Sequence, residues 1–316
     1  MSFPPVEPTP PMAPPGASRS YGAPAFGSGP PPGHRPGRRR RAAGARKFRL
    51  WWVALIVAVA AVIAAALVVV HNIGSPAASD PSGAPMPTGD LAGWHLTYST
   101  DFSGNHLPAG WDAYSGQPGG DPYGYWAPAN VSVSGGELHL RTTANDDPQR
   151  PDTYSTGGVA FYGKTQTYGM YLVRMKGDSE PGLKISNIAL LWPEGNKSWP
   201  PEIDFYEDEG ANRGGYTASL HPGPDGDDCC IVRHSTANSG SQWHTYGVIW
   251  TPTSITYTID GRKWATVKPD DVSSPAKWPD SPMTLDLQSQ NLGQAQPSHS
   301  IETMTVAWVA QYTPGS

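Results

Sequence analysis

The chain has 316 residues, a formal net charge of −5 and two cysteines, enough length for one large domain with accessory segments or two modest domains. Residues 1–49 carry nine of the 22 basic residues and one of the 27 acidic residues, which leaves a formal charge of −13 for the rest. So acidic a segment repels nucleic acid and acidic polymers. We therefore expect a neutral substrate and no nucleic-acid partner.

The N-terminal residues divide into three segments. Residues 1–49 are rich in Pro, Gly, Ser and Arg, which predicts a disordered tail. Residues 50–70 contain no charge, Pro or Gly and span roughly 30 Å as a helix, which predicts a transmembrane helix in a lipid bilayer. A signal peptide cleaved near Ser79 is the alternative. Residues 71–90 resemble a flexible linker in composition.

The basic residues that precede the apolar segment predict its orientation. Arg38 to Arg41, Arg46, Lys47 and Arg49 lie directly before residue 50. By the positive-inside rule, the N-terminus stays in the cytoplasm. We therefore expect a single-pass protein of the cell membrane with residues 91–316 as an extracellular domain.

Residues 91–316 consist of short alternating runs separated by turn residues, such as Glu137-Leu-His-Leu-Arg and Ser254-Ile-Thr-Tyr-Thr-Ile. That period is typical of strands with one buried face. Asp260-Gly261 follows the second run and predicts a hairpin turn. The pattern predicts an all-β sandwich or barrel. The adjacent Cys229 and Cys230 are compatible with a vicinal disulfide or two free thiols, and neither is expected to be catalytic.

Three carboxylates gather in the run Trp199-Pro-Pro-Glu-Ile-Asp-Phe-Tyr-Glu207. In a regular strand Glu202 and Asp204 share a face and Glu207 points to the other one. One extra residue near Phe205-Tyr206, a β-bulge, would bring Glu207 back onto their face. Two glutamates whose carboxyl groups lie about 5–5.5 Å apart can cleave a glycosidic bond by double displacement. A solvated acidic strand and a calcium site are the structural alternatives.

The same run, preceded by Ile188-Ala-Leu-Leu-Trp-Pro193, resembles the active-site signature of glycoside hydrolase family 16. That family contains laminarinases, agarases, carrageenases, lichenases and xyloglucan-modifying transglycosylases. The E-x-D-x-x-E spacing resembles its laminarinase-like branch. The following segments also resemble its blocks: Asp101-Phe102, residues 130–140, 156–159, 168–174 and 243–252. The resemblance implies a concanavalin A-like jelly roll of two curved antiparallel sheets. Together with the predicted transmembrane helix, it suggests a membrane-anchored bacterial member of the family.

The resemblance also implies roles for single residues. Glu202 would be the nucleophile, Asp204 its assistant and Glu207 the acid/base. Substrate-binding candidates are the aromatic residues Trp199, Trp192, Tyr125 and Trp126, together with His221 and Gln288. His221, beside Pro222, is compatible with a simple turn residue as well.

No cofactor and no metal ligand is predicted. Many members of the family place an Asp that holds a structural calcium where this chain has Ala307. A structural calcium elsewhere in the chain stays possible.

These observations predict a retaining endo-β-glycanase that hydrolyses O-glycosidic bonds of a neutral polysaccharide resembling β-1,3-glucan. A galactan is an alternative substrate. Transglycosylation of a wall polysaccharide is a second enzymatic reading, because it shares the covalent intermediate. A lectin-like domain without catalysis is the third. A pure binder has no need for three carboxylates in phase.

Overall fold

The computed structural model describes residues 82–116, 124–144, 154–179, 184–194, 199–223, 230–236, 240–274, 276–292 and 301–315. The predicted tail, transmembrane helix and first part of the linker lie outside these ranges. Within the described ranges, no helix is long and apolar enough to span a membrane. The described residues all belong to one compact unit, residues 74–316.

The described residues form strands and short turns. The strands are β1 (Trp94–Thr100), β2 (Trp111–Ala113), β3 (Gly124–Trp126), β4 (Val131–Ser134), β5 (Glu137–Ala144), β6 (Tyr154–Thr156), β7 (Gly158–Gln166), β8 (Gly169–Gly177), β9 (Ile185–Pro193), β10 (Glu202–Glu207), β11 (Tyr216–His221), β12 (Ile231–Ser235), β13 (His244–Thr251), β14 (Ser254–Ile259), β15 (Arg262–Val267), β16 (Met283–Asn291) and β17 (Ile301–Pro314). Short 3₁₀ turns cover Pro128–Asn130 and Pro269–Asp271.

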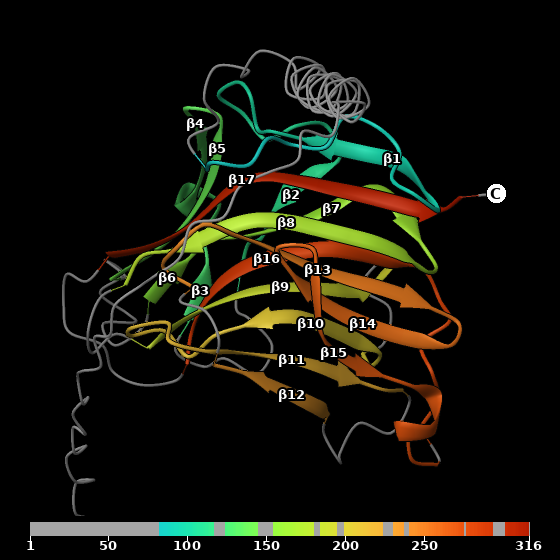
Figure 1. Ribbon diagram of the computed structural model, residues 1–316. Coiled ribbons are helices and arrows are strands. Elements are labelled where there is room, and N and C mark those ends of the chain that lie inside the picture. The colour runs from blue at the N-terminus through green and yellow to red at the C-terminus, as the bar shows by residue number, and fades with distance from the viewer. Residues whose placement is uncertain are drawn as a thin grey trace, which may run out of the picture. The chain divides into compact units, whose positions relative to one another are not determined.

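The strands build two sheets (Figure 1). The seven-stranded sheet has the order β12-β11-β10-β9-β16-β7-β2, with antiparallel neighbours. The ten-stranded sheet follows the path β15-β14-β13-β8-β17-β5-β6-β3, with β1 on β17 and β4 on β5. Only β3 and β6 pair in parallel among the described ladders. The predicted all-β jelly-roll sandwich is confirmed.

One hydrophobic core lies between the sheets. Ile203 and Phe205 of β10 are fully buried in it, together with Trp250 of β13 and Val306 of β17. Because side chains alternate along a strand, the residues between these core positions point to the outer face of each sheet. The outer face of the seven-stranded sheet therefore receives the alternate residues of β10.

The hairpin between β14 and β15 has the predicted turn. Asp260 and Gly261 have φ values of 48° and 73°. A two-residue type I′ turn needs positive φ at both central positions, which glycine and aspartate tolerate well. The Asp-Gly prediction is confirmed.

The ordered domain begins before residue 91, in part of the segment predicted as a flexible linker. Ser82 is buried and its carbonyl accepts a hydrogen bond from Arg174. The Ala84 carbonyl accepts one of 2.7 Å from the indole of Trp308. Both contacts use backbone carbonyls, which any residue carries, so the Pro/Gly-rich composition gives no sign of them.

Candidate active site

Strand β10 carries a β-bulge at Phe205. Against β11, Asp204 pairs with Ser219 and Glu207 with Thr217, so three steps along β10 match two steps along β11. Against β9, Asp204 pairs with Leu190 and Tyr206 with Ala189, which leaves Phe205 as the extra residue. The extra residue resets the alternation and brings Glu207 onto the face of Glu202 and Asp204. The predicted bulge is confirmed.

The two faces of β10 have opposite chemistry. Ile203, Phe205 and Tyr206 belong to the hydrophobic core, and the Tyr206 ring lies 5.0 Å from that of Tyr216. Two successive core residues are possible because the bulge lies there. The core packing therefore fixes the strand so that its carboxylates project outward.

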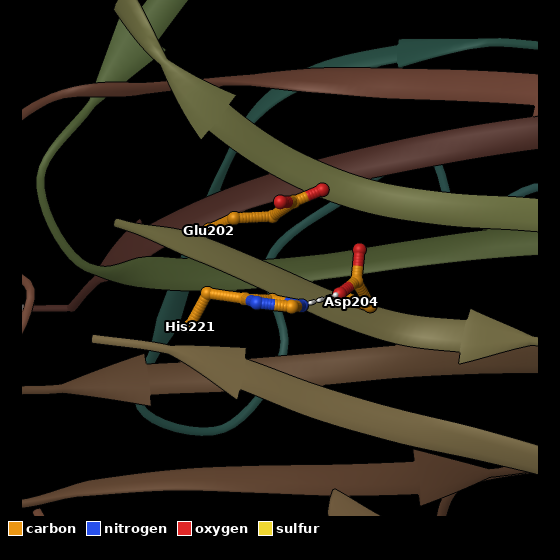
Figure 2. Close-up of side chains that lie close together, drawn as sticks. All are labelled: Glu202, Asp204 and His221. Carbon is orange, nitrogen blue, oxygen red and sulfur yellow. Dashed lines mark ion pairs between the residues drawn. The ribbon is translucent and has the colours of Figure 1, made fainter. Parts of the chain in front are cut away.

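Glu202 and Asp204 of β10 lie beside His221 of β11, and Asp204 forms an ion pair with its ring (Figure 2). One ligand-type atom of each residue lies within 4.8 Å of the others. His221 Nε2 lies 3.1 Å from Asp204 Oδ2. The indole of Trp199 donates a hydrogen bond of 2.6 Å to Glu202 Oε2. Trp199 is 43% exposed, so its ring borders the site while its nitrogen holds the carboxylate.

Burial raises the pKa of all three carboxyl groups. Desolvation, with the Asp204 charge, raises the pKa of Glu202 to about 8. Desolvation and the Glu207 charge hold the pKa of Asp204 well above its usual value. Desolvation and the Glu202 charge raise the pKa of Glu207. Simultaneous ionisation of all three groups is therefore disfavoured, so an ionised and a protonated carboxyl group can coexist in the site.

Trp192 and Gln288 lie on the same face as the carboxylates. Leu191 pairs with Ile203, so its neighbour Trp192 lies beside Glu202 in the ladder. Gln288 pairs with Ile188, which in turn pairs with Glu207. Both side chains are partly exposed. The structure thus brings Trp192, Gln288, His221 and Trp199 to one surface.

Tyr125 and Trp126 lie on β3, in the other sheet. Trp126 is buried and meets the Tyr114 ring edge-on at 5.1 Å. It supports the outer face of the seven-stranded sheet from behind Tyr114. Tyr125 alternates with Trp126 on β3, and its contact with a sugar stays a prediction.

Three further residues of this face were not singled out by the sequence. Tyr114 donates a short hydrogen bond to Asp286 of β16, and Tyr162 of β7 is 41% exposed. Desolvation raises the pKa of Asp286 to about 7, and the Glu202 charge adds to this. The alternation in Met283-Thr-Leu-Asp-Leu-Gln288 could have placed Asp286 with Gln288. No sequence signal pairs it with Tyr114.

A pocket of about 380 Å³ adjoins Glu207. Its walls include Lys184, Glu209 and Thr217, and Asp208 contributes as well. Acidic groups outnumber the single lysine on this wall. Glu207 therefore faces solvent-filled space, as a group that exchanges protons with a ligand must.

Within the described residues, the acidic and histidine side chains close enough to hold a cation are Glu202, Asp204 and His221. They are the same groups that line the candidate site. Ala307 is buried on β17, and its methyl side chain offers no oxygen ligand at the position where the family resemblance implies calcium. Cys230 is disulfide-bonded, and Cys229 is the only other cysteine of the sequence.

Two antiparallel sheets with three carboxylates in phase on one outer face define a jelly roll with a glycosidase-type site. The chain belongs to the glycosyl hydrolases family 16, whose model matches residues 121–310. This family consists of glycosidases, enzymes that hydrolyse O-glycosyl bonds. The family predicted from the sequence is confirmed.

Individual relatives share part of the chain. The endo-1,3-1,4-β-glycanase ExsH of Rhizobium meliloti is 31% identical over 39% of this chain and 26% of its own length. A β-glucanase of Acetivibrio thermocellus is 30% identical over 44% of this chain and 40% of its own length. The chain therefore spans less than half of either relative.

Solved structures show the same fold. The endo-β-1,3-glucanase of Pyrococcus furiosus superposes with a TM-score of 0.63 at 20% identity, over 74% of this chain and 100% of that one. The laminarinase of Rhodothermus marinus superposes with a TM-score of 0.62 at 22% identity, over 71% of this chain and 98% of that one. At this identity the likeness concerns the fold alone.

Proposed function

We propose that this protein is an endo-acting, retaining β-glycanase that hydrolyses a neutral β-linked polysaccharide of the β-1,3-glucan type. The observation that carries the proposal is the bulge at Phe205, which places Glu202, Asp204 and Glu207 on one face. A strand without it would turn Glu207 away from the other two. The relatives named β-glycanase and β-glucanase support the substrate class.

Glu202 is the nucleophile in this proposal. Its carboxylate attacks the anomeric carbon while Glu207 gives its proton to the leaving oxygen, which forms a glycosyl-enzyme ester and breaks the glycosidic bond. Glu207, now ionised, then takes a proton from water as the water oxygen attacks the same carbon and releases Glu202. Each displacement inverts the carbon, so the product retains the β configuration. A separation of roughly 5–6 Å between the two carboxyl groups stays a prediction.

The neighbouring side chains prepare Glu202 for this role. Trp199 holds one oxygen through its indole N–H, which orients the carboxylate. The buried charges of Asp204 and Glu202 repel each other, so simultaneous ionisation of the two groups is disfavoured. A protonated Asp204 can donate to the carboxylate and release it again when the ester forms.

We propose further that residues 50–70 anchor the protein in a membrane and that the catalytic domain lies outside the cell. The support is the length and apolarity of this segment and the arginine cluster before it. Protease added to intact cells should remove residues 91–316 and spare the N-terminus. A secreted form that begins near Ser79 would refute the anchor.

Release of reducing ends by the full chain in mild detergent tests the activity. The panel should contain β-1,3-glucan, mixed-linkage β-1,3-1,4-glucan, agarose and a sulfated galactan. We expect release from the β-1,3-containing glucans, a rapid fall in polymer length, and β-anomers as the first products by proton NMR. Larger oligosaccharides in place of new reducing ends would indicate transglycosylation. Binding without either product would favour the lectin reading.

A further inference from the structure

The outer face of the seven-stranded sheet continues past the catalytic carboxylates toward β7. In β7, Val159 and Phe161 enter the core, so Ala160 and Tyr162 alternate onto the outer face. The ladder runs from Asp204 through Leu190 to Asp286 and on to Ala160. Asp286 thus lies two strand spacings, roughly 10 Å, from Asp204 on the same face.

Tyr162 is an exposed aromatic ring at the β7 end of this face. It is 41% exposed, and Leu91 and Trp199 are the other large hydrophobic side chains described as exposed. Trp199 borders Glu202, so the two exposed rings flank the row of carboxylates from opposite sides. An exposed ring beside a polar row is an arrangement on which the apolar face of a sugar can stack.

Tyr114 covers the same strand next to Tyr162. Its backbone N–H donates to the Gly158 carbonyl at 2.9 Å, and its ring occupies the space where a side chain of residue 158 would lie. A Cβ at Gly158 would come within 2.4 Å of the ring, so only glycine permits this contact. The ring is held edge-on by Trp126, and its hydroxyl donates to Asp286. The backbone, the ring and the hydroxyl group of Tyr114 are therefore each held by a contact.

Asp286 is the anchor of this arrangement and has no role in the proposed mechanism. It is 6% exposed, and Tyr114 donates to its Oδ2. Among the described residues, the donors that lower the pKa of Asp286 are the hydroxyl groups of Tyr114 and Thr284, and Thr284 also donates to the Trp192 carbonyl. Burying a carboxylate with so few donors is costly. Such a cost is expected where a buried group serves function rather than stability.

The field around Tyr162 is negative. The charges of Asp286 and Asp112 both raise the pKa of Tyr162, after desolvation. A sulfate or carboxylate on a sugar at this place would meet these charges at close range. A neutral sugar ring at this place carries no charge and would not be repelled.

We propose that Tyr162 and Tyr114 form a second sugar subsite on the β7 side of the carboxylates, that Asp286 is its positioning residue, and that it accepts neutral pyranose rings and rejects sulfated ones. This inference rests on the proposed function, since it extends the same site. The subsite predicts that kcat/KM depends on sugar units beyond the reacting ring, because those units contact Tyr162 of β7. It also assigns the selection against anionic polymers to two carboxylates outside the reacting centre.

The length dependence of kcat/KM on β-1,3-linked glucose oligosaccharides tests the subsite in the full chain. We expect wild type and Tyr162→Phe to gain with length from two to six units. Tyr162→Ala should lose roughly tenfold on the hexamer, the equivalent of one stacking contact, and little on the dimer. Leu91→Ala is the matched control, since it removes another exposed apolar side chain. Equal length dependence in Tyr162→Ala and wild type, or a uniform loss at all lengths, overturns the subsite.

Tyr114→Phe and Asp286→Asn test the positioning role. Tyr114→Phe keeps the ring but removes the hydrogen bond that fixes it, so KM should rise several-fold for the hexamer and less for the dimer. Asp286→Asn still accepts from Tyr114 but carries no charge. At pH 8, the affinity for a sulfated oligosaccharide should then rise several-fold relative to that for the neutral hexamer. Failure to relax the exclusion of the sulfated ligand refutes Asp286 as its source.

Calorimetry on the Glu202→Gln background separates the subsite from the proposed function. If wild type cleaves no β-glucan, the proposed function fails. The subsite is then judged by hexamer binding alone. Weaker binding in Glu202→Gln/Tyr162→Ala than in Glu202→Gln supports it, and equal binding overturns it.

Discussion

His221 Nε2 lies 3.1 Å from Asp204 Oδ2, and the same histidine is the cross-strand partner of Glu202. A ring that carries positive charge here lowers the pKa of Glu202 and of Glu207. The His221 ring also lies 5.7 Å from that of Trp199, which packs it against the site. His221 is thus the basic side chain that faces Asp204 and Glu202 in this cluster.

Replacement of His221 should shift the acid limb of the pH profile. In His221→Gln the neutral side chain no longer lowers the pKa of Glu202, so more alkaline pH is needed to ionise the nucleophile. We expect the acid limb of kcat/KM to move to higher pH with a loss of roughly tenfold at pH 6. An unchanged profile would show that His221 is neutral in the working enzyme.

Glu202→Gln and Glu207→Gln should each abolish turnover and leave the fold intact, since the amide keeps the shape and cannot ionise. Losses of about 10²–10⁴ or more are expected for removal of a group that moves a proton or attacks. Circular dichroism and melting temperature serve as the control. Activity near the wild-type value in either variant contradicts the assignment.

The two alanine variants, with azide as external nucleophile, distinguish the roles. In Glu202→Ala, azide enters from the vacated side and gives an α-glycosyl azide from an activated substrate. In Glu207→Ala, azide displaces Glu202 from the glycosyl-enzyme and gives the β-glycosyl azide. The reverse pattern would exchange the two roles.

Asp204→Asn should retain more activity than either glutamine variant. The Asp204 charge raises the pKa of Glu202, so its removal lowers that pKa. The acid limb of kcat/KM should therefore extend to lower pH, opposite in direction to His221→Gln. A loss as large as that of Glu202→Gln would mean that Asp204 takes part in bond making rather than assisting it.

The sequence was sufficient for features that depend on local alternation. In the E-x-D-x-x-E spacing, strand alternation puts the second glutamate on the opposite face from the first. A bulge of one residue is the smallest change that brings it back, so the bulge near Phe205 could be predicted. The Asp-Gly hairpin follows from backbone preferences of two residues. These features need only the residues within one strand or turn.

Features that depend on distant residues were missed. Tyr114 and Asp286 are separated by 172 positions and meet because β2, β7 and β16 lie side by side. Nothing in either neighbourhood marks the partner. The anchoring of residues 82–84 uses backbone carbonyls and is equally invisible in composition.

Removal of the bulge residue tests how strictly the chemistry depends on phase. Deletion of Phe205 leaves Glu-Ile-Asp-Tyr-Glu, in which plain alternation again puts both glutamates on one face. We expect weak but measurable activity, above that of Glu207→Gln, with a stability loss of about 3–5 kcal/mol for the lost buried ring. Glu207→Gln in the deletion background is the control, and it should abolish the remaining activity.

Behind the site, Arg213 is fully buried between two carboxylates. It pairs with Asp208, which follows Glu207 directly, and its Nη2 lies 2.8 Å from Glu302 Oε2. Asp208 also accepts from the Tyr206 hydroxyl and the Gly210 N–H, each at 2.7 Å. Desolvation raises the pKa of Glu302 to about 7 in spite of Arg213. The network therefore secures the chain on the far side of the bulge.

Arg213→Met should unfold the domain more easily, because two carboxylates remain buried without a cation. Breaking a buried pair in this way costs about 3–5 kcal/mol. A carboxyl group whose pKa is raised by folding stabilises the fold fully below its unfolded pKa, near 4.5, and loses that contribution as pH rises through the folded value. The loss in Arg213→Met should therefore be larger at pH 8 than at pH 5, and Glu302→Gln in the same background should recover part of it. Arg233→Met is the matched control: its pair with Asp271 is partly exposed, so the cost should stay within about 1 kcal/mol. Equal melting temperatures of Arg213→Met and Arg233→Met at pH 8 would show that the buried network contributes nothing.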